Sequence, residues 1–225
     1  MKKLIDWETL CANCRWVDPM PEECSHKEHP EKDDHASKLS MDSETCPIWW
    51  GLKSPEQPTG EEWGAAFSPC RTYRYDLWRV WSPRGGKVAF IGLNPSTADE
   101  YTNDPTIRRC IGFAKKWGYG GMHMLNIFAY RATDPKVLKQ WPTPAGPEND
   151  RFLYEIAKSS DLVVCAWGSH GEYLDRGVEV AQYLTRSGIM LHCLKKTKGG
   201  HPGHPLYLRG DLEPFPYQPE MGKAK

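Results

Sequence analysis

The chain has 225 residues, and its 29 Lys and Arg residues balance its 29 Asp and Glu residues, so the formal net charge is zero. A neutral chain has no overall field that attracts nucleic acid or a membrane surface, and any basic surface must be local. No apolar run approaches the roughly 20 residues of a membrane span, and the first residues lack the apolar core of a secretory signal. We therefore expect a cytoplasmic, monomeric protein with no membrane partner.

Half of the eight cysteines lie in the polar first fifth of the chain. In a reducing compartment such cysteines are more often metal ligands than disulfides. A short polar segment has little to bury and needs a staple, which four thiolates around one zinc ion would supply. A 4Fe–4S cluster uses the same ligands, and Pro47 after the last cysteine is typical of ferredoxin-type ligation, so both cofactors stay open. The candidate ligands are Cys11, Cys14, Cys24 and Cys46, with His26, His29 and His35 as alternatives if one cysteine is a spectator.

Composition divides the chain into four parts. They are a Cys-rich metal-binding segment over residues 1–50, a linker over 51–70, an α/β domain over 71–215 and a flexible tail over 216–225. The first segment could instead be a disordered tail with chance cysteines. The linker is rich in Pro, Gly and charge and shows no period. Residues 71–81 alternate aromatic and polar side chains, which predicts an edge strand or one half of a hairpin closed by residues 82–86.

From Lys87 onward, apolar strands and amphipathic helices alternate. The expected strands are 87–93, 122–128, 161–167 and 189–194, and the expected helices are 105–117, 149–158 and 171–186. The first helix should be capped by Asn103 or Asp104, begin at Pro105 and end at Gly118. Alternation of this kind gives a parallel sheet with helices on both faces. The predicted fold is therefore a three-layer α/β/α domain with a mainly parallel central sheet of about four strands.

Polar residues follow each of the four predicted strands. They are Asn94-Pro95-Ser96, Asn126 with Arg131, Trp167-Gly168, and the loop HPGHPL over residues 201–206. Each has a structural explanation of its own, such as a turn, a satisfied core amide or a solvated loop. The carboxyl ends of parallel strands, however, converge on one crevice, which is where open α/β sheets bind ligands. The four together favour a binding or catalytic site.

These residues resemble two families. In order and spacing, GLNPS, MLNIFAYRA, VVCAWGSHG and HPGHPL resemble the motifs of the uracil-DNA glycosylase superfamily over roughly residues 87–210. The same stretch, with NDPTIRR and HPLYL, looks still closer to an uncharacterised bacterial and phage family, domain of unknown function 1643, which has no settled activity. This chain departs from the glycosylase pattern at Ser96, in a final loop longer by one residue, and in NDPTIRR, which has no glycosylase counterpart.

The glycosylase resemblance implies roles for individual residues. Asn94 would position a water molecule, with Asp99 as a possible base. Either His201 or His204 would donate a hydrogen bond to a base oxygen as charge develops on it. Asn126 would read the base edge, and Leu206 would act as a wedge that helps to flip the base out. The remaining expected contacts are Ser96, Arg131 and Trp167 to the substrate, and Lys198 with its neighbours Lys195 and Lys196 to phosphates.

The expected activity is that of a glycosylase-like hydrolase that cleaves the N-glycosidic bond of an unusual or damaged base in DNA. Two alternatives remain. One is an enzyme that acts on free modified nucleosides or nucleotides, which the zero net charge slightly favours. The other is a catalytically silent module that binds nucleic acid or a nucleotide through the same crevice.

The cysteine quartet generates a first prediction. The purified full chain should carry about one metal site, and Cys14→Ser should lose it, because a four-thiolate site rarely tolerates loss of a ligand. Elemental analysis of the wild type and the variant checks this. Zinc supports the structural-zinc hypothesis, iron with a brown colour supports the cluster, and absence of both metals contradicts the prediction.

Overall fold

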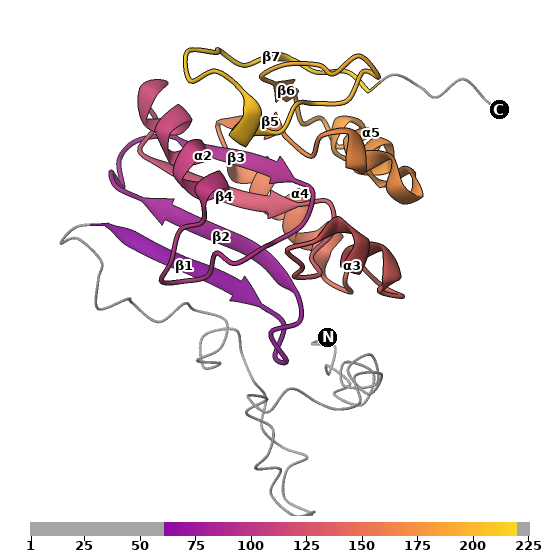
Figure 1. Cartoon of the computed structure of the whole chain (residues 1–225). Coiled ribbons are helices and arrows are strands. Elements are labelled where there is room, and N and C mark those ends of the chain that lie inside the picture. Colours follow the sequence, from indigo (N-terminus) through magenta and orange to yellow (C-terminus); the bar gives the residue numbers. More distant parts are fainter. Residues whose placement is uncertain (1–60, 220–225) are drawn as a thin grey trace, which may run out of the picture.

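The computed structural model describes residues 61–219 as one α/β domain (Figure 1). The four predicted metal ligands and the first half of the predicted linker, residues 51–60, lie outside this range. Within residues 61–219, no group of three or more His, Cys, Asp and Glu side chains could hold a metal ion. No helix in the same range is long and apolar enough to cross a membrane.

The domain is built on a mixed sheet of seven strands in the order β1-β2-β4-β3-β5-β6-β7. Its centre consists of parallel strands: β3 (Lys87–Gly92), β4 (Gly121–Asn126), β5 (Leu162–Cys165) and β6 (Leu191–Cys193). These are the four strands expected from the sequence. Antiparallel strands extend both sides: β1 (Glu62–Phe67) and β2 (Arg74–Val80) on one, and β7 (Phe215–Pro216) on the other.

The antiparallel strands correct several details of the prediction. The sheet has seven strands rather than about four. Strand β2 is not an edge strand, because it lies between β1 and β4. Strand β1 falls inside the range expected to be a linker, because only its short run Ala65–Phe67 is fully apolar and charges and prolines surround it. Strand β7 lies where the tail was expected to begin, and Tyr217 next to it is buried.

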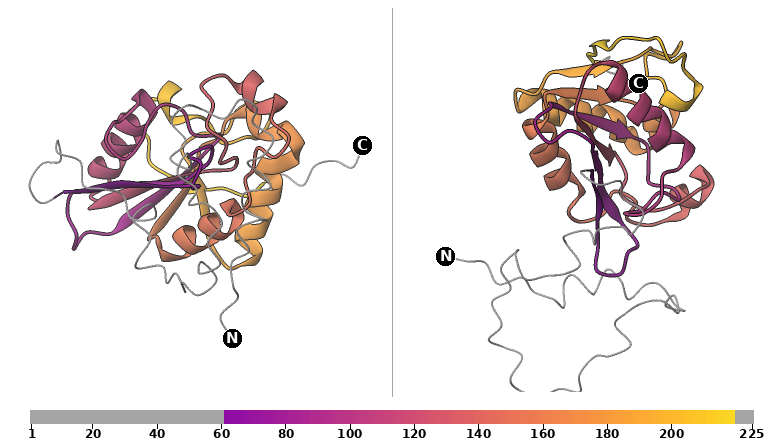
Figure 2. Two further views of the ribbon diagram at one scale, coloured as in Figure 1. Left: turned by 90° about the horizontal axis from the view of Figure 1, so that it is seen from below. Right: turned by 90° about the vertical axis from the view of Figure 1, so that its left-hand side faces the viewer.

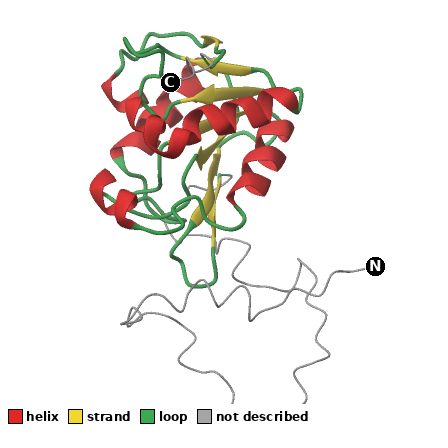
Figure 3. Cartoon of the chain, turned by 90° about the vertical axis from the view of Figure 1, so that its right-hand side faces the viewer, coloured by secondary structure: helices red, strands yellow, loops and turns green. Residues whose placement is uncertain are grey.

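Helices pack on both faces of the sheet, which gives the expected three layers (Figures 2 and 3). Helix α2 (Pro105–Lys116) covers one face, where its apolar side meets alternate residues of the strands, such as Val88 and Phe90. Helices α4 (Asn149–Ser159) and α5 (Arg176–Arg186) cover the other, against Ala89 and Ile91. The two-residue periodicity of β3 thus fills both cores.

The helix boundaries follow local chemistry. Asp104, one of the two expected caps, accepts a hydrogen bond from the Ile107 N–H at 2.8 Å, and Gly118 follows the helix with a φ of 82°. The helix expected over residues 171–186 is divided into a 3₁₀ segment (Ser169–Asp175) and α5. A short helix that is not among the three expected ones, α3 (Pro135–Gln140), lies between β4 and α4.

Two helical glycines give a matched pair of opposite predictions. A Cβ at Gly177 would lie 2.6 Å from Trp167 Nε1 and 3.0 Å from the Gly171 carbonyl oxygen, whereas a Cβ at Gly112 meets nothing within 4 Å. Gly177→Ala should therefore lower the free energy of unfolding by about 1–3 kcal/mol through overpacking. Gly112→Ala should raise it by roughly 0.5–1 kcal/mol through helix propensity. Urea denaturation of both variants checks the pair, and equal shifts would show that Trp167 has room to move.

Candidate functional site

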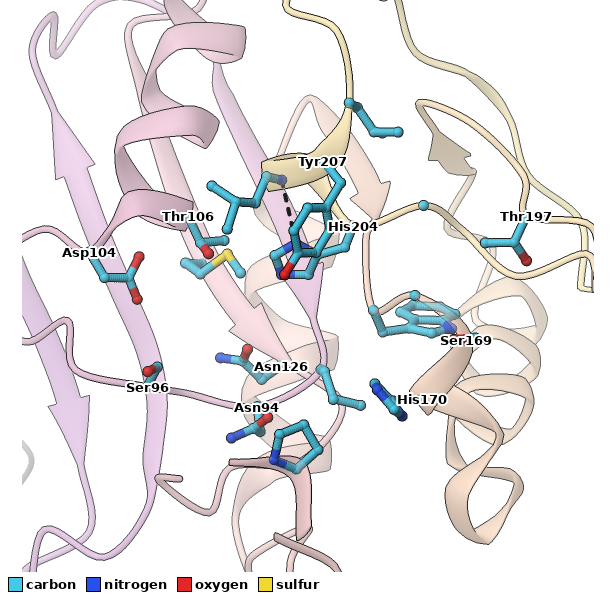
Figure 4. Close-up of a pocket in the computed structure, with 18 of the residues that line it drawn as sticks. Asn94, Ser96, Asp104, Thr106, Asn126, Ser169, His170, Thr197, His204 and Tyr207 are labelled. Atoms are coloured by element: carbon cyan, nitrogen blue, oxygen red, sulfur yellow. Dashed lines mark hydrogen bonds between the residues drawn. The ribbon is translucent and has the colours of Figure 1, made fainter. Parts of the chain in front are cut away.

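A cleft of about 890 Å³ opens where the parallel strands end (Figure 4). Its lining comes from the loop after β3, the end of β4, the start of α2, the segment after β5 and the loop after β6. Of the residues expected in the site, those in the lining are Asn94, Ser96, Asn126, Trp167, Lys198, His204 and Leu206. Those outside it are Asp99, Arg131 and His201. Strand ends far apart in sequence therefore meet in one cleft, as a parallel sheet requires.

The side chain of Asn94 is held so that its oxygen, Oδ1, can accept a hydrogen bond in the cleft. Its Nδ2 donates to the Ala132 carbonyl oxygen at 2.7 Å and to the Pro95 carbonyl oxygen at 3.0 Å. Both amide protons are thereby used, which fixes which side of the amide is oxygen. Oδ1 is left to accept a hydrogen bond from a water molecule or a ligand in the cleft.

The backbone of Asn126 is fixed by hydrogen bonds, but its side-chain amide is available to bind a ligand. Its side chain is 1% exposed, yet neither Nδ2 nor Oδ1 has a hydrogen-bond partner within residues 61–219. Asn149 secures the backbone here, because its Nδ2 donates to the carbonyl oxygens of Asn126 and Ile127 at 3.0 and 3.1 Å. Leaving a buried amide unpaired costs on the order of 1–3 kcal/mol. A ligand with one donor and one acceptor would remove that cost.

Gly92 makes room for this amide. A Cβ at Gly92 would lie 2.6 Å from Met124 Cε and 3.0 Å from Asn126 Oδ1. The glycine of GLNPS is therefore needed because it leaves space for side chains of the neighbouring strand β4, and not because it forms a turn.

The structure separates the two candidate histidines. His204 lines the cleft, and its Nδ1 accepts a long hydrogen bond of 3.4 Å from the Leu206 N–H. Burial lowers the pKa of His204, against an opposing effect of Asp104. A neutral ring whose Nδ1 accepts must carry its proton on Nε2. His201 lies outside the lining and pairs through Nε2 with Glu172 at 2.6 Å.

Asp99 is committed to a turn. Its Oδ1 accepts three hydrogen bonds, from the backbone N–H groups of Tyr101 and Thr102 and from the Thr102 hydroxyl. Partial burial acts to raise the pKa of Asp99, but these bonds outweigh it and hold the pKa below its usual value. A carboxylate of this kind is a weak base, and it does not line the cleft.

Arg131 does not line the cleft. Its guanidinium stands 5.0 Å from the centre of the Phe67 ring and donates to the Arg71 carbonyl oxygen at 3.3 Å. Burial lowers the pKa of Arg131, with the nearby Arg71 as a further cause. Its contacts are therefore with residues outside the cleft.

The final loop is tied to the rest of the site by backbone contacts. The Gly168 N–H donates to the Pro202 carbonyl oxygen at 2.8 Å, and Arg109 of α2 donates to the Leu208 carbonyl oxygen. Between these anchors, Leu206 and Tyr207 form the rim of the cleft, and the Tyr207 side chain is 82% exposed. Hydrogen bonds thus fix both ends of the loop, and the side chains of Leu206 and Tyr207 lie between them at the cleft.

Several residues of the lining were not expected from the sequence. Arg74 comes from β2, Asp104 and Thr106 come from the start of α2, and Tyr207 follows the expected wedge. The segment NDPTIRR, which has no glycosylase counterpart, is the signal in the sequence for Asp104 and Thr106. Arg74 had no signal, because its strand precedes the recognisable alternation.

The domain is thus a mixed α/β fold with a polar cleft at the carboxyl ends of its parallel strands. The chain belongs to the family described as "Protein of unknown function (DUF1643)", whose model matches residues 74–206. No curated protein and no solved structure matches the chain.

The state of His204 is testable in solution. We predict that at pH 7 this ring is neutral, with its proton on Nε2. Because the folded-state pKa lies below the usual 6.5, the unfolded chain binds the proton more readily. The free energy of unfolding should therefore rise with pH up to about that usual value.

Long-range ¹⁵N–¹H correlation spectra, assigned with His204→Gln, give the tautomer directly. The same variant should flatten the pH dependence of stability. A doubly protonated His204 at pH 7 would contradict the prediction.

Proposed function

We propose that the protein is a hydrolase that cleaves the N-glycosidic bond of an unusual or damaged base in DNA. The observation that carries this proposal is the buried, unpartnered amide of Asn126 in the same cleft as the neutral ring of His204. An amide with one open donor and one open acceptor matches the edge of a nucleobase. A neutral imidazole with its proton on Nε2 can donate a hydrogen bond to a base atom on which negative charge develops.

The chemistry needs two contributions from the residues of the cleft, one to the leaving base and one to the attacking water. As the bond between the base nitrogen and C1′ of the sugar breaks, its electron pair leaves with the base. His204 Nε2–H would donate a hydrogen bond to the base as this negative charge develops. Asn94 Oδ1 would accept a hydrogen bond from the water that adds to C1′. Asp99 takes no part in this scheme, so the proton released by the water passes to solvent, and the departing base anion takes up one proton from solvent.

Access to a base in DNA requires it to leave the stack. Leu206 and Tyr207 on the rim would occupy or stack against the space it vacates. Lys195, Lys196 and Lys198 also line the cleft and would contact phosphates.

The test is base release from DNA that carries a panel of modified bases, with mass spectrometry of the products. Asn94→Ala should lose about 10²-fold or more in rate while it still binds DNA, because positioning a water is a transition-state contribution. His204→Ala should also lose rate, and His201→Ala is its matched control and should retain it.

Absence of base release from every substrate, with unchanged ligand binding in Asn94→Ala, would contradict the hydrolase proposal. A second candidate, an enzyme or binding module for free nucleotides, is favoured by the zero net charge and by the size of the cleft. Sites for small molecules typically measure about 300–1,000 Å³.

A further inference from the structure

Arg74 is a buried cation with unused hydrogen-bonding capacity. It is 2% exposed and lines the cleft. A guanidinium has five N–H donors. Within residues 61–219, the Arg74 side chain makes one hydrogen bond, from Nη1 to the Ala98 carbonyl oxygen at 2.8 Å, and its Nε has no partner. None of the ion pairs in that range includes Arg74.

Two further arginines of the described residues, Arg109 and Arg131, also have a buried Nε without a partner, but neither lines the cleft. The two other arginines that, like Arg74, are buried use more of their donors. Arg79 is fully buried and donates five hydrogen bonds, four to carbonyl oxygens and one to the Asn103 side chain. Arg176 donates to a carbonyl oxygen and to the carboxylates of Asp150 and Glu179. Neither of these saturated arginines lines the cleft, whereas the unsaturated Arg74 does.

Arg74 and Asn126 belong to the same wall. Strand β2 is antiparallel to β4, so the start of β2 lies beside the end of β4. The Arg74 N–H donates to the Ala129 carbonyl oxygen at 2.9 Å, just beyond Asn126. Two buried side chains with unpartnered atoms therefore face one ligand site from neighbouring strands.

The charges nearby restrict what Arg74 can bind. Asp104 lines the same cleft, and only its Oδ1 is used, as the cap of α2. Burial lowers the pKa of Arg74 to about 10, and the charge of Asp104 opposes that shift, so the guanidinium is protonated at neutral pH. A negatively charged ligand group would meet the Asp104 carboxylate, which favours a neutral partner with two adjacent acceptors.

We propose that Arg74 reads the O6 and N7 acceptors of a 6-oxopurine, the guanine-type base, in the cleft. Arginine binds this pair of atoms in a bidentate manner. Adenine carries a donor at the C6 position, which would face the donors of Arg74. Uracil and thymine alternate acceptor, donor and acceptor, so they offer no adjacent pair. In cytosine the adjacent pair includes O2, beside the glycosidic nitrogen, where His204 would act.

This inference rests on one part of the proposed function, that the cleft binds a nucleobase, and it does not need cleavage. The test is equilibrium binding of 2′-deoxynucleoside 5′-monophosphates to the full chain by calorimetry. The guanine and hypoxanthine nucleotides should bind roughly 5- to 150-fold more tightly than the adenine nucleotide, the range expected for one bidentate contact. The 7-deazaguanine nucleotide lacks the N7 acceptor and should lose a similar factor, without any change in the protein.

A conservative variant tests the arginine itself. Arg74→Lys keeps the charge and a donor for Ala98, but it lacks the planar fork and should lose the preference for guanine over adenine. Arg79→Lys is the matched control, since it also replaces a buried arginine but lies outside the cleft. Because Arg79 also supports the loop between β3 and α2, this variant should lower Tm and lower the affinity for both nucleotides alike, and it should leave the ratio of guanine to adenine affinity unchanged.

Several outcomes would overturn the inference. They are equal affinity for the guanine and adenine nucleotides, tighter binding of the cytosine nucleotide, displacement of every nucleotide by inorganic phosphate alone, and no binding of any nucleotide at millimolar concentration. Base release from DNA without a guanine-type preference would overturn this inference and leave the hydrolase proposal standing. A guanine-type preference without base release would support the inference and contradict the hydrolase.

Discussion

The geometry of the site depends on buried arginines that hold the loop between β3 and α2. Arg79 donates to the Asp99 and Thr102 carbonyl oxygens and to the Asn103 side chain, and Arg74 donates to the Ala98 carbonyl oxygen. Burying a cation is costly unless hydrogen bonds offset its lost hydration. Here the loop supplies those acceptors, so the arginines and the loop stabilise each other. The loop includes Asn94 and reaches Asp104, the cap of α2, and both residues line the cleft. The position of the loop therefore determines where these two side chains lie.

Around the cleft, carbonyl oxygens of the backbone already accept hydrogen bonds, whereas polar atoms of some side chains remain available to a ligand. Asn149 and Arg176 bind the carbonyl oxygens at the end of β4, while the amide of Asn126 has no partner within the described residues. Asn94 donates both of its amide protons to carbonyl oxygens, so its own side-chain oxygen is available to accept a hydrogen bond. A fixed backbone that carries side-chain polar atoms without partners is expected of a binding site without its ligand. Hydrogen bonds from the ligand to those atoms then contribute to binding.

Much of the domain could be predicted from the sequence, because β3–β6 are mainly apolar and α2 has a capping residue, an N1 proline and a glycine after its end. Strands β1 and β7 could not, since β1 mixes Glu62 and Gly64 with its apolar residues and β7 has only two residues, both exposed. Asn94 and Asn126 could be placed because they end predicted strands. Sequence could not separate His204 from His201, nor show that Asp99 is bound within its own turn, because both depend on contacts that local pattern does not encode. Arg74 reaches the cleft through β2, whose antiparallel position was not apparent.

The central claim is that the cleft binds a nucleobase through the open amide of Asn126. The most direct measurement is the side-chain NH₂ resonance of Asn126 in ¹⁵N-labelled protein during titration with a nucleotide. The account predicts that this resonance shifts and saturates, whereas that of Asn149, which already donates to two carbonyl oxygens, stays in place. An Asn126 resonance that does not move while the nucleotide binds would contradict the account.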